Sequence, residues 1–118
     1  LGQSGPQAPV LSDEPFVIVE QMPSYPGGDI ELLNFIAANT QYPEEAKVAN
    51  IQGRVIVRFI VTKDGRTADA SVIKGVDPLL DEEALRVVNN LGDNWIPGQQ
   101  GGVPVDVWFS VPISFTLK

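Results

Sequence analysis

The sequence predicts an α+β domain: an antiparallel three-stranded sheet with two or three helices packed on one face. The segment 54–62 is rich in β-branched residues, and the hairpin signal Asp64-Gly65 follows it. The segment 103–118 alternates between apolar and more polar side chains, which is typical of a strand with one buried face. Apolar residues at helical spacing occur before the first of these segments and between the two.

The start of the chain is expected to be a linker. Residues 1–15 hold Gly, Gln, Ser and three prolines, a composition typical of a disordered linker or a cloning remnant. Leu1 is not an initiator methionine, so we expect an excised fragment or a processed chain. The folded domain should cover 16–118, beginning with a short strand at 16–20 and a Pro/Gly-rich loop at 23–28.

Two helices are expected before the central strand. The first should begin at Asp29, a plausible N-cap, and end near Asn39. Its core-facing residues should be the apolar ones at helical spacing: Ile30, Leu33, Ile36 and Ala37. The second should begin at Pro43, with acidic residues in its first turn. Its core-facing residues should be Ala46, Ala49 and Ile51.

The segment 54–62 is apolar on nearly both faces, so it should be the middle strand of the sheet. Its hairpin partner should return over about 67–74. Asp77-Pro78 should open a third helix, which Gly92 is placed to end. The apolar stripe of this helix should be Ala84, Leu85, Val88 and Leu91. The predicted strand order is hairpin return strand, central strand, C-terminal edge strand.

The C-terminal strand is predicted to be an edge because Pro104 and Pro112 both fall on its even positions. Proline has no N–H, and strand N–H groups alternate in direction, so both prolines belong on the side without a partner. That side would carry the backbone groups of Asp106, Trp108 and Ser110. It would either be an ordinary edge blunted by proline or dock an extended peptide by strand addition.

Trp108 is the aromatic residue that this pattern places beside the open edge. It lies on the even face, away from the apolar row. An exposed aromatic there suits contact with a peptide. The alternative is packing against the segment 16–19.

Composition excludes several function classes. The formal net charge is −7, which disfavours nucleic acid. The chain has no His and no Cys, so it has no imidazole or thiolate metal site and no Ser-His or Cys-His nucleophile pair. The pairs Glu44/Glu45 and Glu82/Glu83 are adjacent on helices and do not converge as an acid–base pair. We expect no enzyme, no cofactor and no metal.

A series of motifs carries a family resemblance. They are Tyr42-Pro43-Glu44-Glu45-Ala46, Ile51-Gln52-Gly53-Arg54-Val55, Val57-Arg58-Phe59-Ile60-Val61, Asp64-Gly65, Leu80-Asp81-Glu82-Glu83-Ala84-Leu85, Trp95-Ile96-Pro97-Gly98, Gly102-Val103-Pro104-Val105 and Val111-Pro112-Ile113-Ser114-Phe115. Their order and spacing over a core of 42–117 resemble the C-terminal domain of TonB energy transducers. The upstream Met22-Pro23 and Tyr25-Pro26-Gly27-Gly28 look like the Bacteroidetes-type version.

The resemblance implies a periplasmic domain, tethered to the inner membrane by an N-terminal helix that this chain lacks. Such a domain binds the TonB-box peptide of outer-membrane TonB-dependent receptors by strand addition. It transmits force from inner-membrane proton-motor proteins for active uptake of nutrients such as iron–siderophore complexes. The same module also looks similar to one appended to membrane-bound metallopeptidase sensors and other envelope proteins. Pairing of the edge with a second copy would give a homodimer.

By motif, the resemblance places partner binding on one stretch of the last strand and on two residues near the strand's end. These residues are Val105, Asp106, Val107, Trp108, Phe109, Ser110 and Val111, with Gln41 and Tyr42. Pro112 lies inside the strand, so docking should stop or bulge there.

Overall fold

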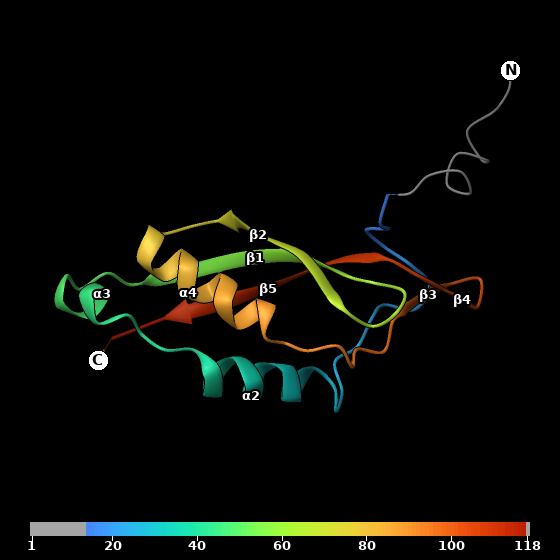
Figure 1. The fold of residues 1–118 in the computed structure, drawn as a ribbon, viewed down its shortest axis with the longest axis horizontal. Coiled ribbons are helices and arrows are strands. Elements are labelled where there is room, and N and C mark those ends of the chain that lie inside the picture. The colour runs from blue at the N-terminus through green and yellow to red at the C-terminus, as the bar shows by residue number, and fades with distance from the viewer. Residues whose placement is uncertain (1–13, 118) are drawn as a thin grey trace, which may run out of the picture.

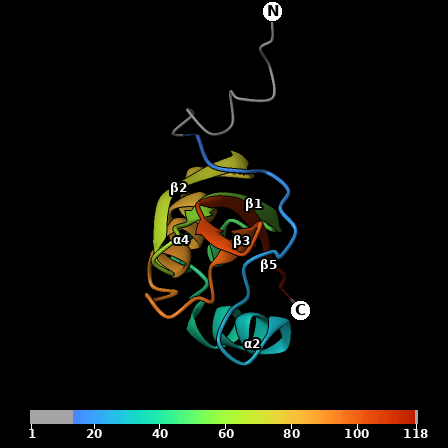
Figure 2. The same cartoon turned by 90° about the vertical axis from the view of Figure 1, so that its right-hand side faces the viewer.

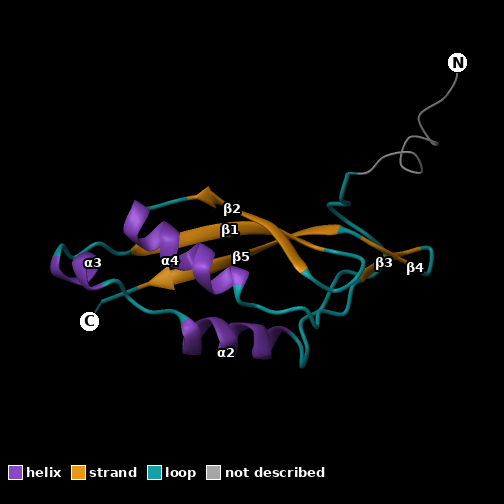
Figure 3. Cartoon of the chain, viewed as in Figure 1, coloured by secondary structure: helices purple, strands orange, loops and turns teal. Residues whose placement is uncertain are grey.

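The computed structural model describes residues 14–117, and from Asp29 onward its three helices and the three strands of its main sheet follow the expected order (Figures 1 and 3). The elements are α2 (Asp29–Asn39), α3 (Glu44–Val48), β1 (Gly53–Val61), β2 (Thr67–Lys74), α4 (Pro78–Asn89), β3 (Gly98–Gln100), β4 (Val103–Val105) and β5 (Val107–Phe115). The expected linker at 1–15 lies almost wholly outside the described residues, as does Lys118. The division of the chain at that point stays a prediction.

The main sheet has three antiparallel strands in the order β2-β1-β5, which confirms the predicted order. Pairing between β1 and β5 is unbroken from Gly53 opposite Phe115 to Val61 opposite Val107. Pairing between β1 and β2 is interrupted twice by irregularities in register. The uninterrupted strand pairing in this sheet is therefore that between β1 and β5.

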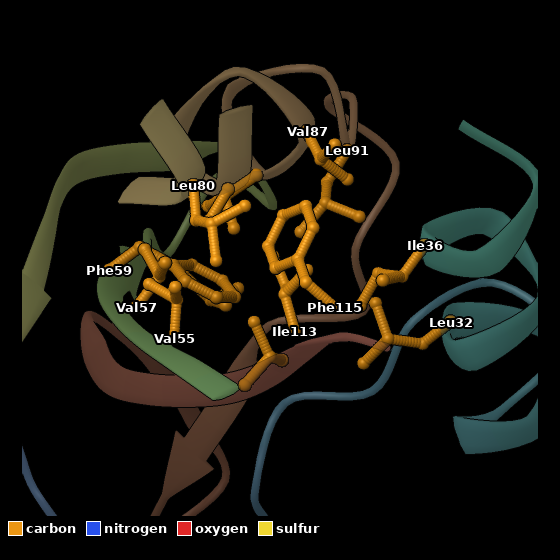
Figure 4. Close-up of a cluster of buried hydrophobic side chains, with 14 of the residues drawn as sticks. Leu32, Ile36, Val55, Val57, Phe59, Leu80, Val87, Leu91, Ile113 and Phe115 are labelled. Atoms are coloured by element: carbon orange, nitrogen blue, oxygen red, sulfur yellow. The ribbon is translucent and has the colours of Figure 1, made fainter. Parts of the chain in front are cut away.

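The hydrophobic core lies between one face of this sheet and the helices (Figures 2 and 4). Alternate residues of β1 and β5 point into it, as the pleat of a strand requires. The fully or almost fully buried side chains from these strands are Val55, Val57, Phe59, Val61, Val111, Ile113 and Phe115. Helix α4 covers them with Leu80, Ala84, Val87 and Val88. At the N-terminus of α4, Asp77 accepts a hydrogen bond from the N–H of Leu79, as its predicted capping role requires.

An aromatic cluster at one end of the sheet joins the N-terminal loop to the core. The ring of Trp95 lies 5.3 Å from Tyr25, 5.7 Å from Phe59 and 5.4 Å from Phe109, between ring centroids. Trp95 Nε1 donates a hydrogen bond of 3.1 Å to Thr67 Oγ1. Edge-to-face aromatic pairs add about 0.5–1.5 kcal/mol beyond burial, so this cluster fixes the chain that leads into α2.

The predicted core face of α2 is partly wrong. Ile36 is buried as expected, but the second buried residue is Leu32. Ile30 and Leu33 are 72% and 56% exposed, and Ala37 is exposed too. Leu32 and Ile36 form the buried stripe of α2, and the half-buried Phe35 also packs against the core, whereas Ile30, Leu33 and Ala37 face outward.

Smaller corrections concern the ends of the two N-terminal helices. Gly28, with φ of 94°, is the N-cap of α2, and Asp29 is its first helical residue. Pro43 is the N-cap of α3. Ala49 is exposed, because α3 ends after one short turn at Val48. Ile51 is half-buried and packs against the core, as expected.

The predicted strand at 103–118 is divided. Val103–Val105 forms β4 and pairs with β3 across a turn at Gly101 and Gly102, whose positive φ values of 61° and 79° suit a tight hairpin. The expected strand at 16–20 is also absent, since only Phe16 makes a strand-like bridge there. Residues 16–24 instead contact the β3 and β5 region through isolated bridges.

A pair of glycine substitutions tests the packing of the β1–β2 turn. A Cβ on Gly65 (φ 82°) would meet the carbonyl oxygen of Trp95, whereas a Cβ on Gly92 (φ 95°) would meet nothing. We expect Gly92→Ala to lower the free energy of unfolding by about 1 kcal/mol through backbone strain alone. Gly65→Ala should cost about 2 kcal/mol or more, because the clash adds to the strain. Urea denaturation of both variants measures the difference, and equal losses would contradict this packing.

Candidate functional site

The outer edge of β5 is the candidate site. Pro112, which has no N–H, lies opposite Ile56, and Trp108 donates its N–H away from β1. The even residues of β5 therefore direct their backbone groups outward, as the sequence predicts. Beyond a bridge at Phe16, no strand of residues 14–117 pairs with this side of β5. The N–H groups of Ser110 and Ser114 and the carbonyl of Pro112 lie along it.

One end of the edge is already occupied. Phe16 donates its N–H to the carbonyl of Asp106, and its own carbonyl accepts the N–H of Trp108, each over 2.8 Å. The expectation that these two groups of Asp106 and Trp108 are open is therefore wrong. A contact between Phe16 and β5 spans 91 positions of the chain, so no local pattern could have predicted it.

A hollow of about 390 Å³ lies where β5 begins. It is lined by Val17, Met22, Arg58, Ile73, Trp108, Phe109 and Ser110. Arg58 Cζ lies 4.1 Å from the centroid of the Trp108 ring, a cation–π contact that orients both side chains. Trp108 is half-buried, so it both contacts the N-terminal segment and presents a surface at the edge.

The side chains of the other residues predicted to bind a partner between 105 and 111 have structural roles. Val107 and Val111 are buried in the core, and Phe109 packs 5.8 Å from Phe59. Asp106 lies between β4 and β5, and its Oδ1 accepts a hydrogen bond of 2.7 Å from the N–H of Lys63. Val105 belongs to β4 and pairs with Gly98. Contact with a partner strand would fall on the backbone and on the even side chains.

Gln41 and Tyr42 lie at the other end of β5. The ring of Tyr42 packs edge-on against Phe115, with centroids 5.5 Å apart. Its hydroxyl donates to the carbonyl of Ile51. The N–H of Gln41 donates to Glu83 Oε2 over 2.6 Å. The structure thus brings Tyr42 close to the end of β5 but not to Trp108.

A charged clamp holds the link between α2 and α3 on α4. Arg86 donates two hydrogen bonds to Glu83, of 2.8 and 2.7 Å, and a third of 2.7 Å to the carbonyl of Asn39. The hydrogen bond from Arg86, together with that from the Gln41 N–H, lowers the pKa of Glu83 below its ordinary value. The sequence analysis named Glu83 only as one of two adjacent acidic residues, although its spacing from Arg86 is that of an i, i+3 pair.

Two other features were sought in the described residues: a metal site and a helix long enough to span a membrane. Residues 14–117 contain no group of three or more Asp, Glu, His or Cys that could hold a metal ion. No helix among them has the length and apolar character that crossing a bilayer requires.

The geometry defines a small α+β domain whose sheet leaves one strand edge accessible, with a hollow where that strand begins. Residues 38–117 match the model of a family described as Gram-negative bacterial TonB protein C-terminal. The chain belongs to this family, as its sequence motifs indicate.

Individual TonB proteins also resemble this chain in sequence. Over 84 residues the chain is 37% identical to Protein TonB of Haemophilus influenzae and 26% identical to Protein TonB of Helicobacter pylori. Each match covers 70% of this chain, but only 30% and 28% of the relatives, so the chain spans less than a third of their length.

Two solution structures of the H. pylori TonB C-terminal domain share the fold. The longer, residues 179–285, matches 75% of this chain and 79% of that domain at 24% identity, with a TM-score of 0.61. The shorter, residues 194–285, matches 75% of this chain and 92% of that domain at 25% identity, with a TM-score of 0.55.

The clamp predicts a pH-dependent contribution to stability. The pKa of Glu83 is lower in the folded chain than in the unfolded chain. The ionised Glu83 carboxylate therefore contributes fully to the free energy of unfolding above the unfolded pKa of about 4.3, and this contribution is lost as pH falls through the folded pKa. Glu83→Gln should lower the free energy of unfolding at pH 7 by about 1 kcal/mol. It should also flatten the decline in stability below about pH 4.3. Glu82→Gln is the matched control, since Glu82 is exposed, and denaturation at pH 3–7 compares them. The same acid-dependent decline in both variants would exclude the clamp as its source.

Proposed function

We propose that this domain binds the TonB-box peptide of outer-membrane receptors by strand addition to β5 and transmits force to them. The observation that carries the proposal is the outward row of backbone groups on β5, in a chain of the TonB C-terminal family. Main-chain hydrogen bonds supply affinity in this mode of recognition, and flanking pockets supply choice.

The free part of the edge supports a docking position later along β5 than the sequence motifs imply. Phe16 occupies the groups nearest Trp108, so a partner strand would lie along Ser110 to Thr116. Pro112 is on the outward side and removes only one donor, while β5 continues in register to Phe115. We therefore infer that a docked strand passes Pro112 and does not stop there.

Such pairing suits the transmission of force. Hydrogen bonds between strands that are pulled along their axis share the load, although each contributes only about 1 kcal/mol net. The unbroken β1–β5 ladder would carry the load into the core, where β1 is held by α4.

The wider setting follows from family membership and is part of the same proposal. The domain would act in the periplasm, be tethered to the inner membrane through a segment outside this sequence, and be driven by proton-motor proteins there. Opened receptors would admit nutrients such as iron–siderophore complexes. The domain itself would be non-enzymatic.

Titration of the ¹⁵N-labelled domain with synthetic TonB-box peptides tests the proposal. We expect amide shifts centred on Ser110 and Ser114. Shifts confined to the helices, with these two amides silent, would overturn it. Sedimentation at several protein concentrations is the companion measurement, because an edge that pairs with its own copy would form a dimer in the absence of peptide.

Two proline substitutions distinguish the backbone N–H groups of β5 that point to the outer edge from those that bond to β1. Ser110→Pro removes an outward N–H, so peptide affinity should fall about fivefold with little change in stability. Val107→Pro removes an inward N–H in the β1 ladder and should cost about 3 kcal/mol or more. Peptide titration and urea denaturation give the two readouts. Loss of fold in Ser110→Pro, or a stable Val107→Pro, would reverse the assigned directions.

A further inference from the structure

The hollow at the start of β5 has the size and lining of a small-molecule site. Its volume of about 390 Å³ lies within the range of ligand pockets, roughly 300–1,000 Å³. Residues from the segment before α2 and from β1, β2 and β5 line it. Apart from Arg58 and Ser110, these lining residues are aliphatic or aromatic. Mostly apolar walls with a few polar groups are typical of sites that bind small organic molecules.

Backbone pairing fixes the wall formed by the segment before α2. Val17 and Met22 belong to this segment, which is drawn in blue in Figure 1. Phe16 bonds the segment to β5, and Gln21 exchanges two hydrogen bonds, of 3.1 and 2.8 Å, with Gln99 of β3. The wall is therefore in place before a ligand arrives, which lowers the entropy cost of binding.

A bulge in β2 brings Ile73 into the lining of the hollow. Val72 lies opposite Val57 and Lys74 lies opposite Ile56, so Ile73 is an extra residue without a partner in β1. An extra residue of this kind bends the strand and re-aims a side chain. Ile73 is 54% exposed, so an apolar ligand in the hollow would remove its side chain from water.

Arg58 supplies the positive charge of the hollow. Its Cζ lies 4.1 Å from the centroid of the Trp108 ring, which holds the side chain in place. The ion pairs within residues 14–117 involve Lys47 and Arg86, so the Arg58 guanidinium has no carboxylate partner among these residues. Both residues opposite Arg58 in the neighbouring strands are serines. A guanidinium in this position can donate two parallel hydrogen bonds to one carboxylate, which favours an anionic ligand.

Two other hollows lack this combination of apolar walls and an available cation. The hollow between α2 and the end of β5, of about 420 Å³, has no charged residue among the described residues that line it. The hollow beside α4, of about 280 Å³, contains Arg86, but Glu83 already forms an ion pair with that guanidinium. Charge complementarity therefore points to the hollow at Trp108.

We propose that the hollow at Trp108 binds a small amphiphilic carboxylate, a molecule of the class of medium-chain fatty acids. Its carboxylate would accept hydrogen bonds from the Arg58 guanidinium. Its apolar body would lie against Met22, Ile73 and Trp108. This site goes beyond the proposed function and does not rest on strand addition to β5.

Titration of the ¹⁵N-labelled chain with octanoate, in the absence of peptide, tests this proposal. The indole N–H of Trp108 and the amides of Ile73 and Ser110 should shift and reach saturation. Octanol offers the same apolar body without the charge, and acetate offers the charge without the body. Octanoate should bind about fivefold or more tightly than either, because only octanoate satisfies both parts of the site.

Variants separate the two parts of the site. Arg58→Gln should weaken octanoate binding about fivefold or more and remove its advantage over octanol. Arg54→Gln is the matched control, because Arg54 is exposed on the same face of β1 but lies outside the hollow, and its effect should stay below about twofold. Ile73→Thr should weaken octanoate and octanol alike, about threefold or more. Ile30→Thr, at a residue that is 72% exposed on α2 and outside the hollow, should leave both affinities unchanged.

Several results would overturn the proposal. Equal affinities of the unmodified chain for octanoate and octanol would remove the role of Arg58. Equal weakening by Arg54→Gln and Arg58→Gln would reduce the effect to a general attraction to positive charge. Shifts at Ala37 and Thr116 in place of Trp108 would assign binding to the hollow beside α2, and the absence of saturable shifts would exclude the site. None of these results bears on strand addition, which the peptide titration tests separately.

Discussion

The antiparallel pairing of β1 with β5 is the interaction on which the rest of this structure depends. Because the register is unbroken, it sends every odd side chain of β5 into the core and every even backbone group to the outer edge. The same alternation places Pro112 where its missing N–H costs no ladder bond. A slip of one residue would bury Ser110 and turn Val111 outward, so core and edge are specified together.

Much of this arrangement could be predicted because it follows from local patterns. The two-sided apolar character of β1 indicated its central position, and Pro112 at an even position indicated that β5 is an edge. Pro104, which the same argument used, lies in β4 and not on this edge. Asp77 was recognisable as a helix cap. In each case a single physical rule, applied to neighbouring residues, was sufficient.

The features that could not be predicted depend on contacts between distant segments. The face of α2 was ambiguous, because Ile30 and Leu33 fit helical spacing as well as Leu32 and Ile36 do, and only packing against the sheet decides. The division of the last strand at Asp106 depends on β3 and on the N–H of Lys63. The bond between Glu83 and Gln41 joins α4 to a link 42 positions earlier.

The bridge at Phe16 shortens the accessible edge of the sheet. It consists of two hydrogen bonds, each contributing about 1 kcal/mol net, and it lies outside the main core cluster. Release of Phe16 would expose the carbonyl of Asp106 and the N–H of Trp108 without disturbing β1 or α4. A short segment upstream of α2 therefore covers the first hydrogen-bonding repeat of the outer edge of β5, and the accessible strand begins only beyond it.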